Sequence, residues 1–176
     1  QKSYFKNIFP YVEISEIDIS SGAINNINYV DVNKAPSRAK MIIRDNDIII
    51  STTRPNRGAI SLVKTDGILI ASTGFCVIRN ISDKVQREYL FKILKSSIVL
   101  NQFDQRSSGG NYPAITQEEI GKVLIPLPSI QIQNKIANHI ENIREQAKSL
   151  KQQAIDDFEK AKKEVEGMIL GEIDEI

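Results

Sequence analysis

A regular stripe of apolar residues occupies the last quarter of the chain. These residues follow one another at steps of three or four positions, so they share one helix face with a spacing close to that of a coiled-coil seam. An additional step of four, from Ala154 to Phe158, is a stutter, which locally unwinds a supercoil. The stripe consists of Ile132, Ile136, Ile140, Ile143, Ala147, Leu150, Ala154, Phe158, Ala161, Val165 and Met168.

We therefore predict one long helix over residues 129–176, with Ser129 near its N-cap. About 38 helical residues at 1.5 Å each form a rod of roughly 57 Å, too long for a domain of ~130 residues to cover. Because no second long helical pattern exists in the chain, a partner chain is the expected cover. Folding back onto the chain's own domain is the alternative. The expected interface residues are Ile136, Ile140, Ile143, Ala147, Leu150, Ala154, Phe158, Ala161 and Val165.

Residues 1–128 show short apolar runs separated by turn residues, which is typical of strands. The spacing of residues 83–100 predicts a helix with Ser82 as its N-cap, and residues 116–119 form a capping-box pattern for a short helix. We predict an α+β protein, in which a mixed α/β domain over 1–128 precedes the coiled-coil-forming helix. The predicted strands are 11–14, 27–32, 47–51, 59–64, 68–71, 74–79 and 123–127.

The charge of the chain divides at the same point. The sequence has 23 basic and 22 acidic residues, for a net charge of +1. Residues 129–176 hold 7 basic and 10 acidic residues, which leaves 16 basic and 12 acidic residues in 1–128. The near-neutral total therefore hides a basic domain, net +4, joined to an acidic helix, net −3.

Composition argues against catalysis by this chain. One Cys (Cys76) and one His (His139) exclude a disulfide framework and a multi-Cys or Cys2His2 zinc site. No nucleophile elbow or phosphate-binding glycine motif occurs. Asp45 and Asp47 are close, but no third acid accompanies them, and they suit a turn. We expect no catalytic residue, metal or cofactor. The absence of Cys pairs and of an apolar run of ~18 residues predicts a cytoplasmic protein without a membrane span.

A basic stretch is the main candidate for function. Residues 34–64 hold seven basic and two acidic residues. Arg54 and Arg57 lie in a loop, residues 51–58, together with three hydroxyls and Asn56. Guanidinium and amide groups can recognise base edges, whereas hydroxyls and lysines favour phosphates, although an ordinary solvated loop has the same composition. The first candidates for DNA contacts are Arg38, Lys40, Arg54 and Arg57, followed by Lys64.

A second loop, residues 105–113, is rich in Ser, Gly and Asn, so its backbone can approach a phosphate closely. A turn that joins two helices is the alternative interpretation. The candidates in this loop are Arg106, Ser107, Asn111 and Tyr112.

The run SSGGNYPAITQEEIGKVLIPLPSIQIQNKIANHI resembles the end of a target recognition domain in the specificity subunit of type I restriction-modification systems. The matching features are a glycine-rich loop, a short helix, an I-P-L-P phrase and a Gln-containing start of a long helix. The segments MIIRDNDIIISTTRPNRGAI and STGFCVIR also fit this family. The matching residues are Gly109, Gly110, Ile125, Pro126, Leu127, Pro128, Gln133 and Ile136, and upstream Asp47, Ser51, Arg54, Pro55 and Gly58.

The resemblance implies a non-catalytic role in double-stranded DNA recognition. A complete specificity subunit of this family has two recognition domains separated by two long helices. Each domain binds half of a bipartite site, methylation subunits that modify adenine dock along the helices, and a motor-nuclease subunit cleaves DNA. This chain shows one domain and one helix, so it is either half of a longer subunit or a half-subunit that pairs with itself. Self-pairing would produce a symmetric split site recognised by two copies.

Two alternatives remain open from the sequence. One is the recognition module of another restriction-methylation enzyme, which uses the same domain. The other is a coiled-coil adaptor whose front domain binds protein rather than DNA.

Overall fold

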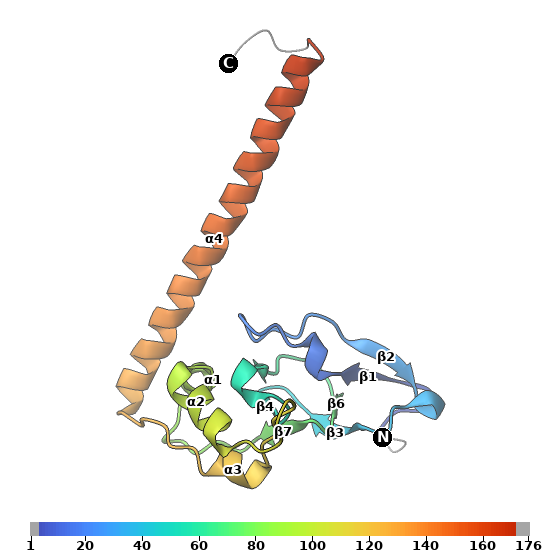
Figure 1. Ribbon diagram of the computed structural model, residues 1–176, viewed down its shortest axis with the longest axis vertical. Helices are drawn as coiled ribbons and strands as arrows, with labels where there is room; N and C mark the ends of the chain where they lie inside the picture. The colour runs from blue at the N-terminus through green and yellow to red at the C-terminus, as the bar shows by residue number, and fades with distance from the viewer. Residues whose placement is uncertain (1–3, 172–176) are drawn as a thin grey trace. The chain divides into compact units, whose positions relative to one another are not determined.

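The computed structural model describes residues 4–171, and the chain divides into two compact units, residues 1–134 and 135–176. Figure 1 shows the course of the chain. The elements are β1 (Ile8–Val12), η1 (Ile14–Glu16), β2 (Asn28–Asp31), η2 (Val32–Lys34), β3 (Ala39–Ile43), β4 (Ile48–Ser51), η3 (Pro55–Arg57), β5 (Ile60–Leu62), β6 (Leu69–Ser72), β7 (Phe75–Ile78), α1 (Arg87–Leu94), α2 (Ser97–Arg106), α3 (Gln117–Gly121) and α4 (Ile130–Ile169), where η marks a 3-10 helix.

The strands form two sheets, and the chain crosses between them three times: from β3 to β4, back from β5 to β6, and again from β6 to β7. One sheet has the order β2-β1-β6-β3, and the other has the order β5-β4-β7. The turn after β3 and the turn after β6 each carry the chain from the first sheet to the second. Helices α1, α2 and α3 lie on the side of β4 and β7 that is away from β1 and β2 (Figure 1).

Strand β4 lies at the centre of residues 1–134, which we call the front unit. Its successive side chains point to opposite faces, so they pack into two different hydrophobic cores. Ile48 and Ile50 pack with residues of α1 and α2, including Leu90 and Phe103. Ile49 points the other way, into a cluster between the two sheets. A third cluster, around Phe9, Tyr11 and Ile70, covers the opposite face of the four-stranded sheet. A strand buried on both faces explains the continuous apolar run in the sequence.

An ion pair between the buried Asp47 and the partly exposed Arg79 links the two sheets at one end. The Arg79 guanidinium donates to both Asp47 carboxylate oxygens, Nε to Oδ1 at 2.8 Å and Nη2 to Oδ2 at 2.6 Å. It also donates to the Ile42 carbonyl of β3 at 3.0 Å, while the Arg44 backbone N–H donates to Asp47 at 2.7 Å. The hydrogen bond to Asp47 raises the pKa of Arg79. Asp47 was predicted as a turn residue, and its carboxylate is fully used in holding the sheets together.

Two local predictions were wrong. Residues 83–100 form two helices rather than one, because α1 starts only at Arg87, with Gln86 as N-cap in place of Ser82, and ends before Lys95. Residues 123–127 form no strand: the Gln102 side-chain amide bonds both backbone groups of Leu124, at 2.9 Å each. The short helix α3 is confirmed, with the Thr116 hydroxyl accepting the Glu119 N–H at 3.2 Å.

The long C-terminal helix is confirmed as α4, which ends at Ile169, and residues 172–176 of the predicted range lie outside the described residues. Most of the apolar stripe of α4 is exposed. Ile143, Leu150, Phe158 and Val165 have 50%, 66%, 70% and 51% of their surface accessible. Side chains of this size gain about 1.5–3 kcal/mol each when they are buried. The stripe is therefore an uncovered apolar face in this structure.

The first turn of α4 is tied to the front unit by Gln133, a fully buried side chain. Its Nε2 donates to the carbonyls of Lys84 at 3.0 Å and Pro128 at 2.8 Å, and its Oε1 accepts the Gln86 N–H at 2.8 Å. The amide thus joins the start of α4, the preceding turn and the start of α1.

We expect Gln133→Leu to lower the free energy of unfolding by about 1–3 kcal/mol, because it leaves buried backbone groups without their partner. Urea unfolding of the full chain measures this loss. The matched control is Gln131→Leu, since Gln131 lies on the same turn but is exposed. Equal effects of the two substitutions would show that the buried amide contributes little.

Candidate nucleic-acid interface

The loop over residues 51–58 has an unusual backbone that several hydrogen bonds support. Arg54 and Gly58 flank the 3-10 helix η3, and both adopt left-handed conformations, with φ of 48° and 74°. A left-handed Arg is uncommon and requires support from its surroundings. Below the loop, the buried Ser51 hydroxyl donates to the Thr53 carbonyl at 2.7 Å, which fixes the chain as it leaves β4.

The second predicted loop is a small hairpin. Ser108 and Ala114 exchange two backbone hydrogen bonds, of 2.9 and 2.8 Å. Between them, the Tyr112 N–H donates to the Gly109 carbonyl at 3.1 Å, and Gly109 has a φ of 102°, which favours glycine. The hairpin leaves Tyr112 72% exposed at its tip.

The structure brings these two loops together, although they lie some 50 residues apart in the sequence. The Arg54 N–H donates to the Pro113 carbonyl at 2.7 Å, and its guanidinium donates to the Asn111 carbonyl at 3.2 Å. The same guanidinium lies 4.4 Å from the centroid of the Tyr112 ring, in a cation–π contact. Arg54 therefore holds both the left-handed turn and the hairpin in place.

Arg38 and Lys40, two further candidates, are linked to the loops by the turn between β6 and β7. The Gly74 carbonyl accepts the Thr52 N–H at 2.8 Å, and the Arg38 carbonyl accepts the Thr73 N–H at 2.8 Å. The pairing of β3 with β6 is irregular between Ala39 and Met41, so Lys40 is the extra residue of a β-bulge. Lys40 is exposed, as bulges often re-aim a side chain.

These contacts define one surface at one end of both sheets, which we name the basic rim. The Asp47–Arg79 pair lies at the opposite end. Arg57 is exposed, and its side chain makes no hydrogen bond or ion pair with any of residues 4–171. The basic rim consists of Arg38, Lys40, Arg54, Arg57, Thr73, Asn111 and Tyr112.

Three residues that were predicted to contact DNA lie outside the basic rim, and each bonds to another part of the chain. The Lys64 ammonium donates to Asn46 at 2.9 Å, at the far end of β4. Arg106 forms an ion pair with Glu119 at 3.1 Å, and Lys122 and Arg106 together lower the pKa of that carboxyl. The Ser107 hydroxyl donates to the Phe103 carbonyl at 2.7 Å, which caps the end of α2.

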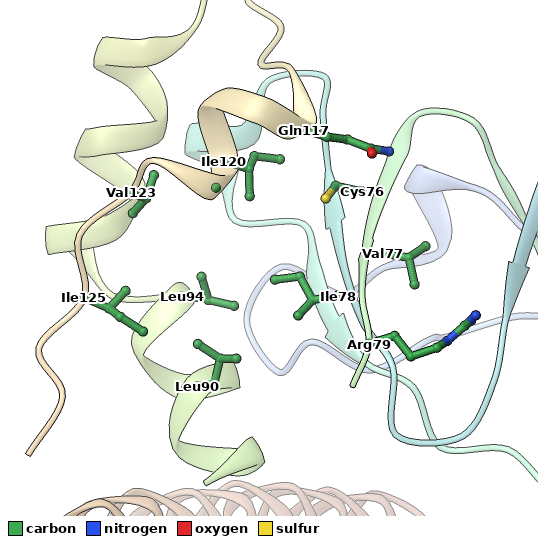
Figure 2. A pocket seen from close by; sticks show the side chains of 11 residues that line it. Cys76, Val77, Ile78, Arg79, Leu90, Leu94, Gln117, Ile120, Val123 and Ile125 are labelled. Carbon is green, nitrogen blue, oxygen red and sulfur yellow. The ribbon is translucent and has the colours of Figure 1, made fainter. Parts of the chain in front are cut away.

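A separate hollow of about 450 Å³ lies between β7, α1, α3 and the segment that follows α3. Figure 2 shows Ile78, Leu90, Ile120 and Ile125 around it, with the Cys76 thiol at one side. Burial raises the pKa of Cys76, so the thiol stays protonated and is a poor nucleophile. The lining of the hollow is mainly apolar, and the Arg79 guanidinium at its edge is bound to Asp47.

No group of three or more His, Cys, Asp or Glu side chains within residues 4–171 could hold a metal ion. Over the same residues, no helix is long and apolar enough to cross a membrane.

Sequence reasoning missed the β6–β7 turn as part of this surface. The available signal was the short Ser72-Thr73 interruption before Gly74, which separates the predicted strands 68–71 and 74–79. In the structure a Cβ at Gly74 would lie 2.7 Å from the end of the Ile14 side chain. The sequence could not show that this turn lies between Arg38 and Thr52, since that depends on how the two sheets pack.

Comparison with known proteins places these features in a family. Residues 2–159 match the domain described as "Type I restriction modification DNA specificity domain". The chain is 29% identical over 138 residues to the type I restriction enzyme HindI specificity subunit of Haemophilus influenzae, which covers 76% of the chain and 30% of that subunit. It is 22% identical to the MjaVIII specificity subunit of Methanocaldococcus jannaschii, covering 92% of the chain and 41% of the relative.

Solved structures agree. The crystal structure of the HsdS subunit from Thermoanaerobacter tengcongensis superposes with a TM-score of 0.72 and 38% identity, covering 81% of this chain and 37% of that one. A structure reported for complex assembly and conformational transition of the type I R-M system gives a TM-score of 0.73 and 36% identity, with 92% and 41% covered. The chain thus spans between 30% and 41% of the length of these relatives.

Proposed function

Because this chain belongs to the type I restriction modification DNA specificity domain family, we propose that it recognises one half of a bipartite double-stranded DNA site. In this proposal, residues 1–128 form the target recognition domain, and residues 129–176 form a spacer and pairing helix. The chain makes and breaks no bonds itself. Methylation subunits that dock on it modify adenine, and a motor-nuclease subunit joins through them in the cytoplasm.

The observation that carries the proposal is the convergence of the basic rim. Four separate segments contribute to it: the start of β3, loop 51–58, the β6–β7 turn and the 108–114 hairpin. Each is fixed by backbone hydrogen bonds, so their exposed cations and amides stand on a rigid support. Arginine, lysine and asparagine are the side chains that contact phosphates and base edges in DNA-binding proteins.

We further propose that two copies of the chain associate through α4. The exposed stripe on this helix supports the proposal, since a second copy would bring an identical stripe to cover it. An association of two copies about a two-fold axis presents two identical basic rims. The DNA site is then symmetric and split, with the helices setting its spacing.

We expect Arg57→Ala to weaken specific DNA binding by about 10- to 100-fold, the equivalent of 1–3 kcal/mol for one base contact. Fluorescence anisotropy at several salt concentrations measures this effect. If Arg57 contacts a base, the loss falls on the specific sequence alone; if it contacts a phosphate, all sequences lose affinity and the salt slope falls by about one. Lys84→Ala is the control, because Lys84 is exposed but remote from the basic rim.

The test of the function as a whole is to map modified adenines in DNA from cells that carry the complex. A single bipartite motif, lost when Arg54 and Arg57 are both replaced by Ala, is the expected result. Unchanged methylation in that double variant would contradict the assignment of loop 51–58. Binding of a methylation subunit without any DNA preference would instead indicate an adaptor.

A further inference from the structure

A second hollow, of about 360 Å³, adjoins the basic rim. One wall comes from the segment around η1 and consists of Ile14, Ser15, Ile17 and Ile19. The other wall comes from loop 51–58 and its exit, and includes Arg57 and Ala59. The hollow therefore combines an apolar lining with guanidinium groups, and no acidic side chain within residues 4–171 lines it.

The Lys95 side chain connects the two walls of this hollow. The Lys95 ammonium donates to the Ile19 carbonyl at 2.8 Å on one wall and to the Gly58 carbonyl at 3.3 Å on the other. The turn that follows Ile19 packs closely on α1, since a Cβ at Gly22 would lie 2.5 Å from the Phe91 ring. A hollow with fixed walls is preorganised, so a ligand entering it does not have to order them.

The lining selects among the groups that DNA exposes. Guanine presents only acceptors in the major groove, adenine presents an acceptor and a donor, and cytosine presents a donor. Thymine alone presents an apolar methyl group beside an acceptor, its O4. A phosphate offers acceptors and charge but nothing that gains from an apolar lining.

We propose that this hollow receives the 5-methyl group of a thymine in the recognised half-site, while Arg57 donates to O4 of the same base. Ile14, Ile17 and Ile19 then surround the methyl group, and the uncommitted guanidinium of Arg57 supplies the polar contact. This inference rests on the proposed function, and it adds one base pair that the domain must select. Loop 51–58 then contributes to sequence selection both through the basic rim and through the hollow that it lines.

The experiment uses the full chain assembled with its methylation subunit, and duplexes that carry the mapped site. Each thymine of the site is replaced singly by deoxyuridine, which removes the methyl group and keeps base pairing. We expect one position in each half-site at which binding weakens about fourfold, the fold-change that corresponds to one buried methyl group.

Two matched substitutions locate the effect. Ile19 and Ile8 are 53% and 55% exposed, but only Ile19 lines the hollow. In Ile19→Ser, the difference between thymine and deoxyuridine should fall below about twofold, because part of the apolar lining is lost. Ile8→Ser should keep the full difference, and thermal unfolding of both variants checks that each remains folded.

The outcomes separate this inference from the function on which it rests. Sequence-specific binding that no single deoxyuridine weakens, or a half-site without thymine, overturns the inference and leaves the function standing. A thymine effect that survives in Ile19→Ser, or disappears equally in Ile8→Ser, overturns the location. Absence of any sequence preference overturns the proposed function, and the inference with it.

Discussion

Arg79→Met should lower the free energy of unfolding by about 3–5 kcal/mol, the usual cost of leaving a buried charge without its partner. Asp47 is 2% exposed, and the substitution removes both of its bonds to the guanidinium. The Ile42 carbonyl also loses its donor, so the link between the two sheets is broken on both sides. Urea unfolding followed by circular dichroism measures the loss.

Arg44→Met is the matched control. It makes the same change three residues from Asp47, in an exposed side chain, and keeps the backbone N–H that Asp47 accepts. Its effect should stay within about 0.5 kcal/mol. Adding Asp47→Asn to Arg79→Met should recover part of the stability, because the buried group is then neutral. A loss in Arg79→Met no larger than in Arg44→Met would show that the pair does not hold the sheets together.

Phe158→Asp should raise the dissociation constant of the paired chain by about 10²- to 10⁴-fold. Each copy loses a Phe that is buried in the pair, at about 1.5–3 kcal/mol per side chain, and the pair contains two copies. Sedimentation equilibrium at micromolar concentration measures the change.

Ser149→Asp serves as the control, since it adds the same charge on the opposite face of α4 and should leave association unchanged. A chain that is monomeric at micromolar concentration without any substitution would contradict self-pairing. In that case a second recognition domain, or a different partner, must cover the stripe.

The elements that the sequence predicted well are those determined by local pattern. The three- and four-residue steps of α4, the Thr116 cap of α3 and the continuous apolar run of β4 each depend on a few neighbouring residues. Both candidate loops could also be predicted as loops, because Pro, Gly and Asn interrupt the apolar pattern there.

The errors have physical reasons that lie outside local pattern. The spacing Leu90, Leu94 and Ile98 continues one helical face, but the chain turns at Lys95 and Ser96. As a result, α2 buries Val99 and Phe103 and leaves Ile98 60% exposed. Strand β3 was missed because the bulge at Lys40 interrupts its alternation. Residues 123–127 have the composition of a strand, but a side chain, Gln102, takes the place of a neighbouring strand.

The candidate site was found only in part for the same reason. Basic composition identified Arg38, Lys40, Arg54 and Arg57, but it could not separate an available guanidinium from one that is already paired. The difference between Arg57, which is uncommitted, and Arg106, which is bound to Glu119, depends on residues that are distant in the sequence. The apolar hollow beside Arg57 likewise depends on Lys95, which lies in the turn between α1 and α2 and is distant from the loops in the sequence.

The separation of the Asp47–Arg79 pair and the basic rim to opposite ends of the sheets has an evolutionary consequence. Changes in the loops of the basic rim leave the sheet-to-sheet link untouched, so new target sequences can arise without loss of the fold. Because loop 51–58 and the 108–114 hairpin bond to each other through Arg54, they are expected to change together. A transplant of target preference between relatives should therefore move both loops as a pair.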